Sequence, residues 1–193
     1  SNKLIVTANT ATIDAGGNID VSAQGFTGSN GTGAGTAAGN GAGHGGIGGN
    51  AGGGAYGSIT QPTNLGSGGG NNGGNGGGAI KLEVAGTLTV NGTLSANGNI
   101  YNAGFSGGGA GGSIWLIANT LAGSGTVRVN GGAGYSNGYG GGAGGRIAID
   151  VQSDTSTLVS TAGRLQAYGG TANTSTTNGM AGAGTIWTRV APQ

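Results

Sequence analysis

Cysteine is absent from the 193 residues, and charged residues are scarce, with six Lys or Arg and five Asp or Glu. Without cysteine the chain can form neither a disulfide framework nor a thiolate metal site. The formal net charge is +1, so the charge excess typical of proteins that bind nucleic acid or anionic membranes is missing. No apolar run approaches the roughly 18 residues that span a bilayer, and no basic-then-apolar targeting segment opens the chain. We therefore expect no nucleic-acid partner and no membrane insertion.

Glycine is abundant, at 53 of 193 residues, a level close to that of low-complexity chains. Disordered chains, however, usually combine a high net charge with few β-branched residues. Here the net charge is small, and the Val, Ile and Leu residues fall into clusters that recur along the chain. This distribution favours a folded repeat protein over a disordered one.

One short apolar segment recurs five times. Each copy alternates apolar with mixed residues, which is the period of a β-strand that buries one face. The first residues of the last four copies lie 34, 33 and 39 positions apart. The predicted strands are residues 4–8, 80–84, 114–118, 147–151 and 186–190. Their alignment predicts an inward column of Ile80, Ile114, Ile147 and Ile186, backed by Leu82, Leu116 and Ile149.

A second strand is predicted after each of the three copies in the middle of the chain. Residues 88–98 match residues 121–131 and 158–169, and a glycine tract then leads into the next copy. The tracts have a three-residue rhythm, and polyproline-II geometry has three residues per turn. We therefore predict glycine helices that pack backbone to backbone, with recurring Cα–H···O contacts. The alternative is that the tracts are flexible linkers.

The predicted fold is all-β, a parallel β-solenoid-like stack of repeats of about 33–39 residues with packed polyglycine-II (Gly-Gly-X) segments. Equivalent strands would pair in parallel about 4.8 Å apart. We predict a single domain over residues 1–193, with a long glycine-rich insert at 26–78. The predicted repeats lie near residues 3–25, 52–66 (a degenerate copy), 79–98, 113–132, 146–170 and 185–190.

The units GGGAIKLEVAGTLTVNGTLSANG and GGGAGGSIWLIANTLAGSGTVRVNGG resemble the glycine-rich repeats of very large bacterial surface and secreted proteins. The resemblance covers residues 79–190 well and residues 1–25 partly. Such repeats occur in proteins that largely lack an assigned activity. The glycine tracts are also similar to those of phage tail-tip adhesins and small antifreeze proteins, whose polyglycine-II helices bundle together. In the adhesins, loops between the tracts contact the host receptor, although regular apolar strands do not dominate their repeats as they do here.

Residues suited to catalysis are few, and an enzyme needs several convergent polar or ionisable groups. Glu83 and Asp150 are the nearest approach to a carboxylate pair, and they would lie two repeats apart. His44 lies in a glycine tract without a nearby Asp or Glu, so we expect a structural role and not metal binding. No Gly-Lys-Ser/Thr follows a glycine tract as in a phosphate loop, and the tracts lack the aspartate of calcium-binding nonapeptide repeats. We therefore predict a protein that is not an enzyme and uses no cofactor or metal.

The outward side chains would form two rows if the repeats stack in register: Lys81, Trp115, Ala148 and Trp187 in one, and Glu83, Ile117, Asp150 and Arg189 in the next. The two tryptophans would then lie roughly 10 Å apart. Such a strip could stack sugar rings or contact a partner protein, because exposed apolar patches often mark contact sites. The alternative is that a glycine helix covers this face and buries both tryptophans.

Further aromatic residues lie in or beside the turns that follow the second strands. Aromatic side chains at loop tips are adaptable contact residues, but they could equally cover the open edges of the glycine tracts. The candidate contact residues are therefore Trp115, Trp187, Tyr101, Phe105, Tyr135, Tyr139 and Tyr168.

The leading hypothesis for function is a non-enzymatic structural and adhesive repeat module of an extracellular surface or fibre protein. The sequence begins and ends with a copy of the first strand, and unpaired strand edges are templates for association. We therefore expect stacking on neighbouring repeats or on further copies of the chain. The alternative is a receptor-binding tip of a phage tail or a bacterium that uses the aromatic loops to bind a cell-surface glycan or protein. Ice binding is a third hypothesis, but Thr87, Thr89 and Thr93 do not recur as the regular array that it needs.

Overall fold

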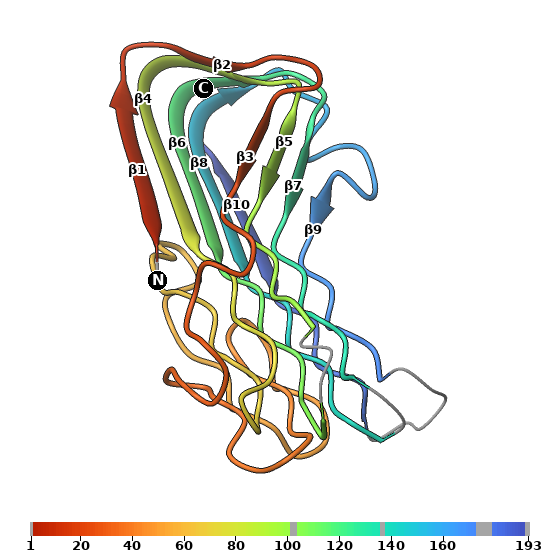
Figure 1. Ribbon diagram of the computed structural model, residues 1–193. Helices are drawn as coiled ribbons and strands as arrows, with labels where there is room; N and C mark the ends of the chain where they lie inside the picture. The colour runs from red at the N-terminus through yellow and green to blue at the C-terminus, as the bar shows by residue number, and fades with distance from the viewer. Residues whose placement is uncertain (1, 101–103, 136–137, 173–178, 192–193) are drawn as a thin grey trace.

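The computed structural model describes residues 2–100, 104–135, 138–172 and 179–191. Within these residues, ten β-strands occupy one half of the molecule. Glycine-rich segments that form no strands occupy the other half, below the strands in Figure 1. We call this second half the glycine lobe; it comprises the described residues of 25–78, 97–112, 130–145 and 167–184.

The strands form two sheets in which every pair is parallel. The six strands of sheet A are β1 (Lys3–Ala8), β2 (Ala11–Ile13), β4 (Ala79–Val90), β6 (Ser113–Ala122), β8 (Arg146–Asp154) and β10 (Thr185–Val190). Their order is β1-β4-β6-β8-β10, and β2 also pairs with β4. Sheet B has the order β3 (Asn18–Asp20), β5 (Thr93–Ser95), β7 (Thr126–Arg128) and β9 (Leu165–Gln166).

The predicted register of the recurring strands is confirmed. Leu4, Ile80, Ile114, Ile147 and Ile186 are directly paired across the five neighbouring strands of sheet A. The three isoleucines in the middle of this column are almost fully buried, whereas Ile186 is 45% exposed. The difference arises because β10 is an edge strand, so no described strand pairs with its outer side.

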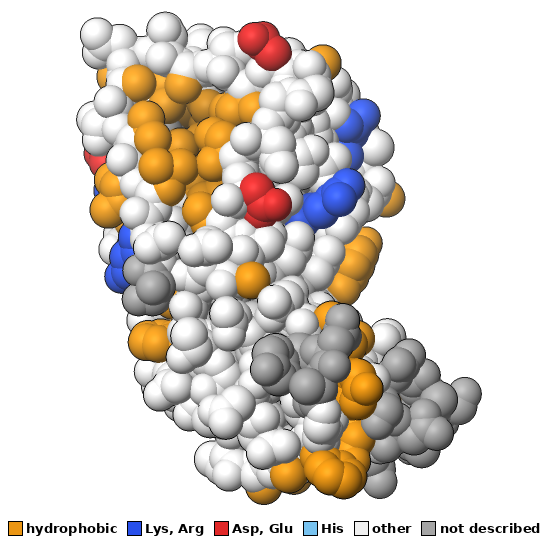
Figure 2. All heavy atoms as spheres, viewed as in Figure 1, with side chains coloured by type: hydrophobic (Ala, Val, Ile, Leu, Met, Phe, Trp, Pro, Cys, Tyr) orange, Lys and Arg blue, Asp and Glu red, His pale blue; other side chains and the backbone are white. Residues whose placement is uncertain are grey.

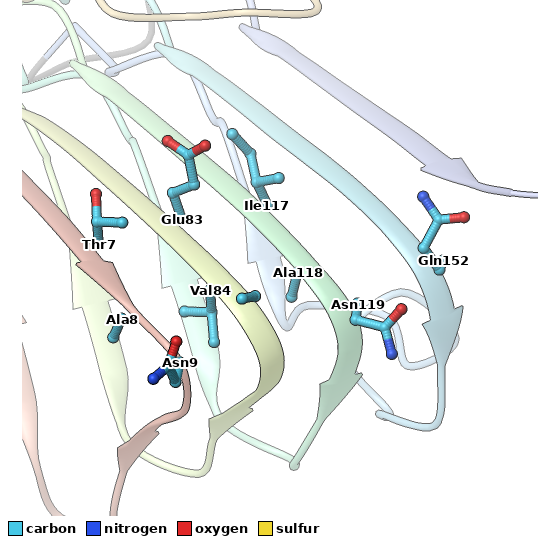
Figure 3. A pocket seen from close by; sticks show the side chains of 10 residues that line it. Thr7, Ala8, Asn9, Glu83, Val84, Ile117, Ala118, Asn119 and Gln152 are labelled. Atoms are coloured by element: carbon cyan, nitrogen blue, oxygen red, sulfur yellow. The ribbon is translucent and has the colours of Figure 1, made fainter.

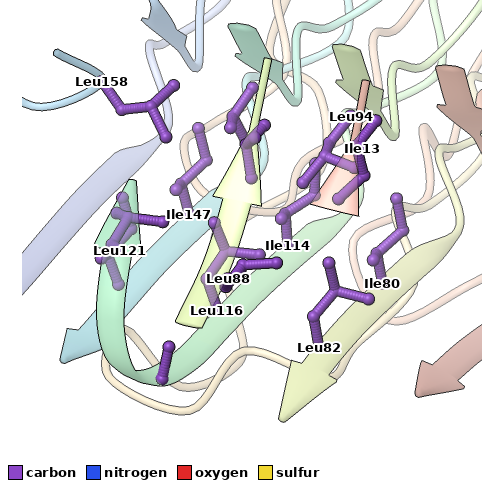
Figure 4. Close-up of a cluster of buried hydrophobic side chains, with 14 of the residues drawn as sticks. Ile13, Ile80, Leu82, Leu88, Leu94, Ile114, Leu116, Leu121, Ile147 and Leu158 are labelled. Atoms are coloured by element: carbon purple, nitrogen blue, oxygen red, sulfur yellow. The ribbon is translucent and has the colours of Figure 1, made fainter. Parts of the chain in front are cut away.

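The hydrophobic core lies between the two sheets. Sheet A contributes alternate side chains, among them Ile80, Leu82, Ile114 and Leu116, and sheet B contributes Leu94 (Figure 4). These side chains are at most 2% exposed. Because strand side chains alternate between faces, the remaining side chains of β4, β6 and β8 point away from the core.

The fold-class prediction is wrong. In place of an all-β parallel β-solenoid-like stack with packed polyglycine-II segments, the chain forms two separate all-parallel sheets, an arrangement like that of α/β proteins but with almost no helix. Among the described residues the sheets do not close into a solenoid coil. The reason is that the stretch from the second strand of one repeat to the first strand of the next is rich in glycine. It carries too few side chains to form a third strand against the core, and it runs into the glycine lobe instead (Figure 1).

The insert at residues 26–78 contains no strand, so the degenerate repeat predicted at residues 52–66 is not formed as a strand pair. Part of this segment instead lies against sheet A on the side away from the core. The Ser113 hydroxyl donates a hydrogen bond to the Asn64 carbonyl (2.6 Å), and Arg146 Nε donates one to the Tyr56 carbonyl (2.8 Å). The insert is therefore attached to β6 and β8 by its peptide groups.

The segments of the glycine lobe are joined to one another by backbone hydrogen bonds. Gly41 donates to the Gly49 carbonyl (3.0 Å), Gly49 to Gly141 (2.9 Å) and Gly141 to Gly179 (2.9 Å). The backbones approach so closely that a Cβ atom on Gly41 would lie 1.8 Å from the Gly141 carbonyl oxygen. Glycine is therefore required at residue 41 by close approach of the backbones.

Candidate functional site on the outward face of sheet A

The outward face of sheet A, turned away from the core, carries two rows of side chains in the predicted register. Ile5 begins the row that continues through Lys81, Trp115, Ala148 and Trp187. Thr7 begins the row that continues through Glu83, Ile117, Asp150 and Arg189. Side chains from five strands thus share one surface. The two predicted rows of four residues are confirmed, and the structure adds Ile5 and Thr7 of β1 to them.

The two tryptophans of the first row are both half-buried. They are therefore neither fully exposed, as a contact strip would require, nor fully buried under a glycine helix. The Lys81 ammonium lies 4.7 Å from the centre of the Trp115 ring, within the range of a cation–π contact. The same ammonium donates a 2.8 Å hydrogen bond to Glu83. Between the tryptophans, Ala148 is fully buried, so the two rings do not form one continuous exposed strip.

An open hollow of about 600 Å³ lies beside the C-terminal ends of β1 and β8 and the middle of β4 and β6 (Figure 3). Its polar lining consists mainly of hydroxyl and amide side chains, with Ile117 between them. The polar lining residues are Thr7, Asn9, Glu83, Asn119 and Gln152. The hollow can therefore offer both donors and acceptors to a ligand.

The formal charges near the hollow are paired. Glu83 is bonded to Lys81, as described above. Arg189 binds Asp150 through two hydrogen bonds of 2.7 Å, from Nε to Oδ1 and from Nη2 to Oδ2. This confirms that the two are cross-strand neighbours, and the fork geometry fixes the guanidinium in place. The surface around the hollow is therefore polar but close to neutral.

A buried polar cluster at the junction of the insert and the sheets was not predicted. His44 is fully buried, and its Nδ1 donates a 2.7 Å hydrogen bond to the Gly111 carbonyl, since a carbonyl can only accept. Its ring lies 4.7 Å from the Tyr56 ring. Nε2 has no hydrogen-bond partner among the described residues. Burial is the main reason that the pKa of His44 falls from 6.5 to about 4.

Arg146 and Tyr56 complete this cluster. The guanidinium is buried, and it donates hydrogen bonds to the carbonyls of Tyr56 (2.8 Å) and His44 (3.4 Å) and to the Thr185 hydroxyl (2.9 Å). Burial lowers the pKa of Arg146, and it raises the pKa of Tyr56 to about 12. The Tyr56 hydroxyl donates to the Leu65 carbonyl (2.5 Å). These groups all hold the insert in place, and none faces the hollow.

Four of the remaining candidate contact residues, Phe105, Tyr135, Tyr139 and Tyr168, lie in the glycine lobe and not on the outward face. Phe105 and Tyr168 are 64% and 55% exposed, and Tyr135 is 36% exposed. Tyr139 packs edge-on against Phe105, with ring centres 5.7 Å apart. Tyr101 lies outside the described residues. The aromatic residues predicted as one set thus divide between two surfaces.

No helix in the described part of the chain has the length and apolar character needed to cross a membrane. The described residues also contain no group of three or more His, Asp or Glu side chains placed to hold a metal ion. Comparison of the chain with protein-family models, with curated proteins and with solved structures finds no match.

Proposed function

We propose that this chain is a non-enzymatic structural and adhesive module of an extracellular surface or fibre protein, and that the outward face of sheet A binds a neutral glycan. The observation that carries the proposal is the open hollow lined by hydroxyl and amide side chains beside Trp115. The absence of cysteine, the low charge and the repeated strands also suit an extracellular module.

A neutral sugar matches this surface in chemistry. Sugars present hydroxyl groups that both donate and accept hydrogen bonds, and their ring faces are apolar. Asn119 and Gln152 are exposed, and each amide side chain offers both a hydrogen-bond donor and an acceptor. Ile117 and the half-buried Trp115 offer apolar surface beside them. Because the nearby charges are already paired, a charged ligand would find no free countercharge there.

The alternative is a receptor-binding tip that uses the aromatic residues of the glycine lobe. The exposure of Phe105 and Tyr168 favours it. Under this alternative the partner would contact the glycine lobe, and the outward face of sheet A would have no part in binding.

A glycan array probed with the purified chain tests the proposal, followed by calorimetry on the glycans that bind. We compare the wild type with the double variant Asn119→Ala/Gln152→Ala and with the matched control Phe105→Ala/Tyr168→Ala, all four residues being exposed. Loss of two hydrogen bonds of about 1 kcal/mol each predicts an affinity roughly 10- to 30-fold weaker for the first variant. The control should bind as the wild type does. Binding lost only in the control would establish the alternative, and an array without any bound neutral glycan would overturn the proposal.

A further inference from the structure

At the β1 end of the molecule, sheet A has an open edge and the core is open to solvent. Within the described residues no strand pairs with the outer side of β1. Figure 2 shows hydrophobic side chains gathered between the positions of β1 and β3. Leu4, Val6 and Ile19 pack against the core but remain partly exposed. A contiguous apolar surface of this kind marks an interaction site in a soluble protein.

At the opposite end, β10 leaves a second open edge and a second apolar surface. The outer side of β10 is likewise unpaired in the described chain. Val159, Ile186 and Val190 are 41%, 45% and 47% exposed. Beside them lies a hollow of about 290 Å³, whose lining includes Leu158, Leu165, Ile186 and Thr188. The core is therefore open at both ends of the stack of strands.

The peptide groups on the two edges are complementary. Thr185 and Ala191 donate hydrogen bonds to carbonyls of the β8 side, at 3.0 Å and 2.9 Å. Peptide groups of successive residues in a strand point to opposite sides, so those of residues 186, 188 and 190 face away from β8. On β1 the Asn2 carbonyl accepts from Ala79 at the β4 side (3.2 Å). By the same alternation, the peptide groups of residues 3, 5 and 7 face away from β4.

The register of a continuing strand follows from the strands already present. Within sheet A, the peptide N–H of the first residue of each strand donates to the carbonyl of the residue that lies just before the start of the neighbouring strand. The pairs, donor first, are Ala79 and Asn2, Ser113 and Gly78, Arg146 and Gly112, and Thr185 and Gly145. A second copy that follows this rule places its Lys3 beside Thr185. Its Leu4 then lies beside Ile186 in the inward column, and its Thr7 lies beside Arg189.

At the β10 end sheet B stops one level before sheet A, because β9 lies level with β8 and no described strand of sheet B lies level with β10. Ile19, Leu94, Val127 and Leu165 are paired in sequence across β3, β5, β7 and β9. A copy in this register therefore places its Ile19 two strand spacings, about 10 Å, from Leu165, across the hollow at the β10 end that Leu165 lines. No like charges meet in these rows, because Thr7 faces Arg189 and Lys3 faces Thr185.

We infer that the partner at these edges is a second copy of this chain, docked head to tail, with β1 of one copy extending sheet A beyond β10 of the next. The inference goes beyond the proposed glycan contact, since it uses the two edges of the sheet and not its outward face. The interface is heterologous: different surfaces of the two copies meet, and each docked copy leaves a free edge for another. Such contacts produce filaments unless the rotation closes a ring.

Engineered cysteines test the register, because the chain contains no cysteine of its own. Thr7→Cys/Arg189→Cys places two cysteines in one row of neighbouring copies, about 4.8 Å apart at Cα, within the range of a disulfide. Inside one copy they sit on opposite edges, roughly 19 Å apart, and cannot bond. In the control Lys3→Cys/Arg189→Cys, the cysteine on β1 lies four residues earlier than residue 7. It is therefore displaced by about 13 Å along the strand from the position opposite residue 189. After mild oxidation we expect a ladder of covalent oligomers for the first variant and monomers for the control.

A proline on the open edge provides the second measurement. The peptide N–H of Thr188 faces away from β8, so Thr188→Pro removes an edge donor without breaking a hydrogen bond of sheet A. We expect light scattering and electron microscopy to show filaments that grow with concentration for the wild type and for Thr188→Ala. Thr188→Pro should remain monomeric with an unchanged circular dichroism spectrum. A wild type that is monomeric at every concentration, or equal ladders from both cysteine pairs, would overturn the inference, whatever the glycan array shows.

Discussion

The buried imidazole of His44 makes the stability of the fold depend on pH. In the folded chain Nδ1 donates to Gly111, and Nε2 has no acceptor within reach in the described structure. Protonation would place a charged N–H at Nε2, in a buried site where Arg146 already donates to the His44 carbonyl. Burial and the nearby guanidinium both oppose this charge, and the pKa of His44 is lowered from 6.5 to about 4.

The sign of the effect follows from proton linkage. Between pH 6.5 and pH 4 the unfolded chain binds a proton at His44 and the folded chain does not, so the free energy of unfolding falls as the pH is lowered through this window. Each pKa unit corresponds to about 1.36 kcal/mol. The shift from 6.5 to about 4 therefore predicts a loss of about 3 kcal/mol between pH 7.5 and pH 4.

Urea unfolding of the wild type and of His44→Asn at pH 7.5 and pH 4 measures this contribution. Asparagine retains an amide donor for Gly111 but does not titrate. The variant will be less stable at neutral pH because it leaves part of the imidazole volume empty, but it should lose about 3 kcal/mol less than the wild type on acidification. Subtracting the variant's loss of unfolding free energy on acidification from the wild type's loss cancels the contribution of the carboxylates, which both chains share. Equal losses in the two chains would refute the role assigned to His44.

Two further predictions concern the glycine lobe and the core. Gly41→Ala forces a methyl group onto the Gly141 carbonyl and should lower the free energy of unfolding by about 3 kcal/mol or more. Gly54→Ala, where a Cβ atom meets nothing within 4 Å, should change it by no more than about 1 kcal/mol. Thermal melts would contradict this reasoning if both variants behaved alike. Leu116→Ala removes a fully buried side chain and should cost about 2–5 kcal/mol, whereas Ile186→Ala on the half-open edge should cost clearly less in the same urea titration.

The strand pairing of sheet A could be predicted from the sequence because its signal is local and repeated. The alternation around Ile80, Ile114 and Ile147 recurs at nearly constant spacing, and equal spacing fixes which residues pair when the strands stack. The rows of outward side chains follow directly, since successive side chains of a strand point to opposite faces. For this reason Glu83 and Ile117 could be placed side by side before the structure was known. The hollow itself and its amide side chains Asn119 and Gln152 were not predicted, because they lie where the strands bend and outside the predicted rows.

The course of the glycine-rich segments could not be predicted, because glycine has no side chain whose burial pattern indicates a direction. The solenoid-like closure failed for this reason, as did the strand pair expected at residues 52–66. The cluster of His44, Tyr56 and Arg146 joins residues up to 102 positions apart through backbone carbonyls. Carbonyl acceptors are present at every residue and leave no trace in the sequence. A lone histidine, tyrosine and arginine in different segments therefore gave no sign that they meet.

The glycine lobe also determines how the two halves of the molecule respond to temperature. Unfolding the strand half exposes apolar side chains, which raises the heat capacity, whereas unfolding the glycine lobe exposes mostly peptide groups, which lowers it. The two contributions oppose each other within one chain. Its heat-capacity change per residue should therefore be smaller than that of an ordinary domain, and its stability curve correspondingly flatter. The apolar interior between sheets A and B would then be the main source of any loss of stability on cooling, since the peptide hydrogen bonds of the lobe do not depend on the hydrophobic effect.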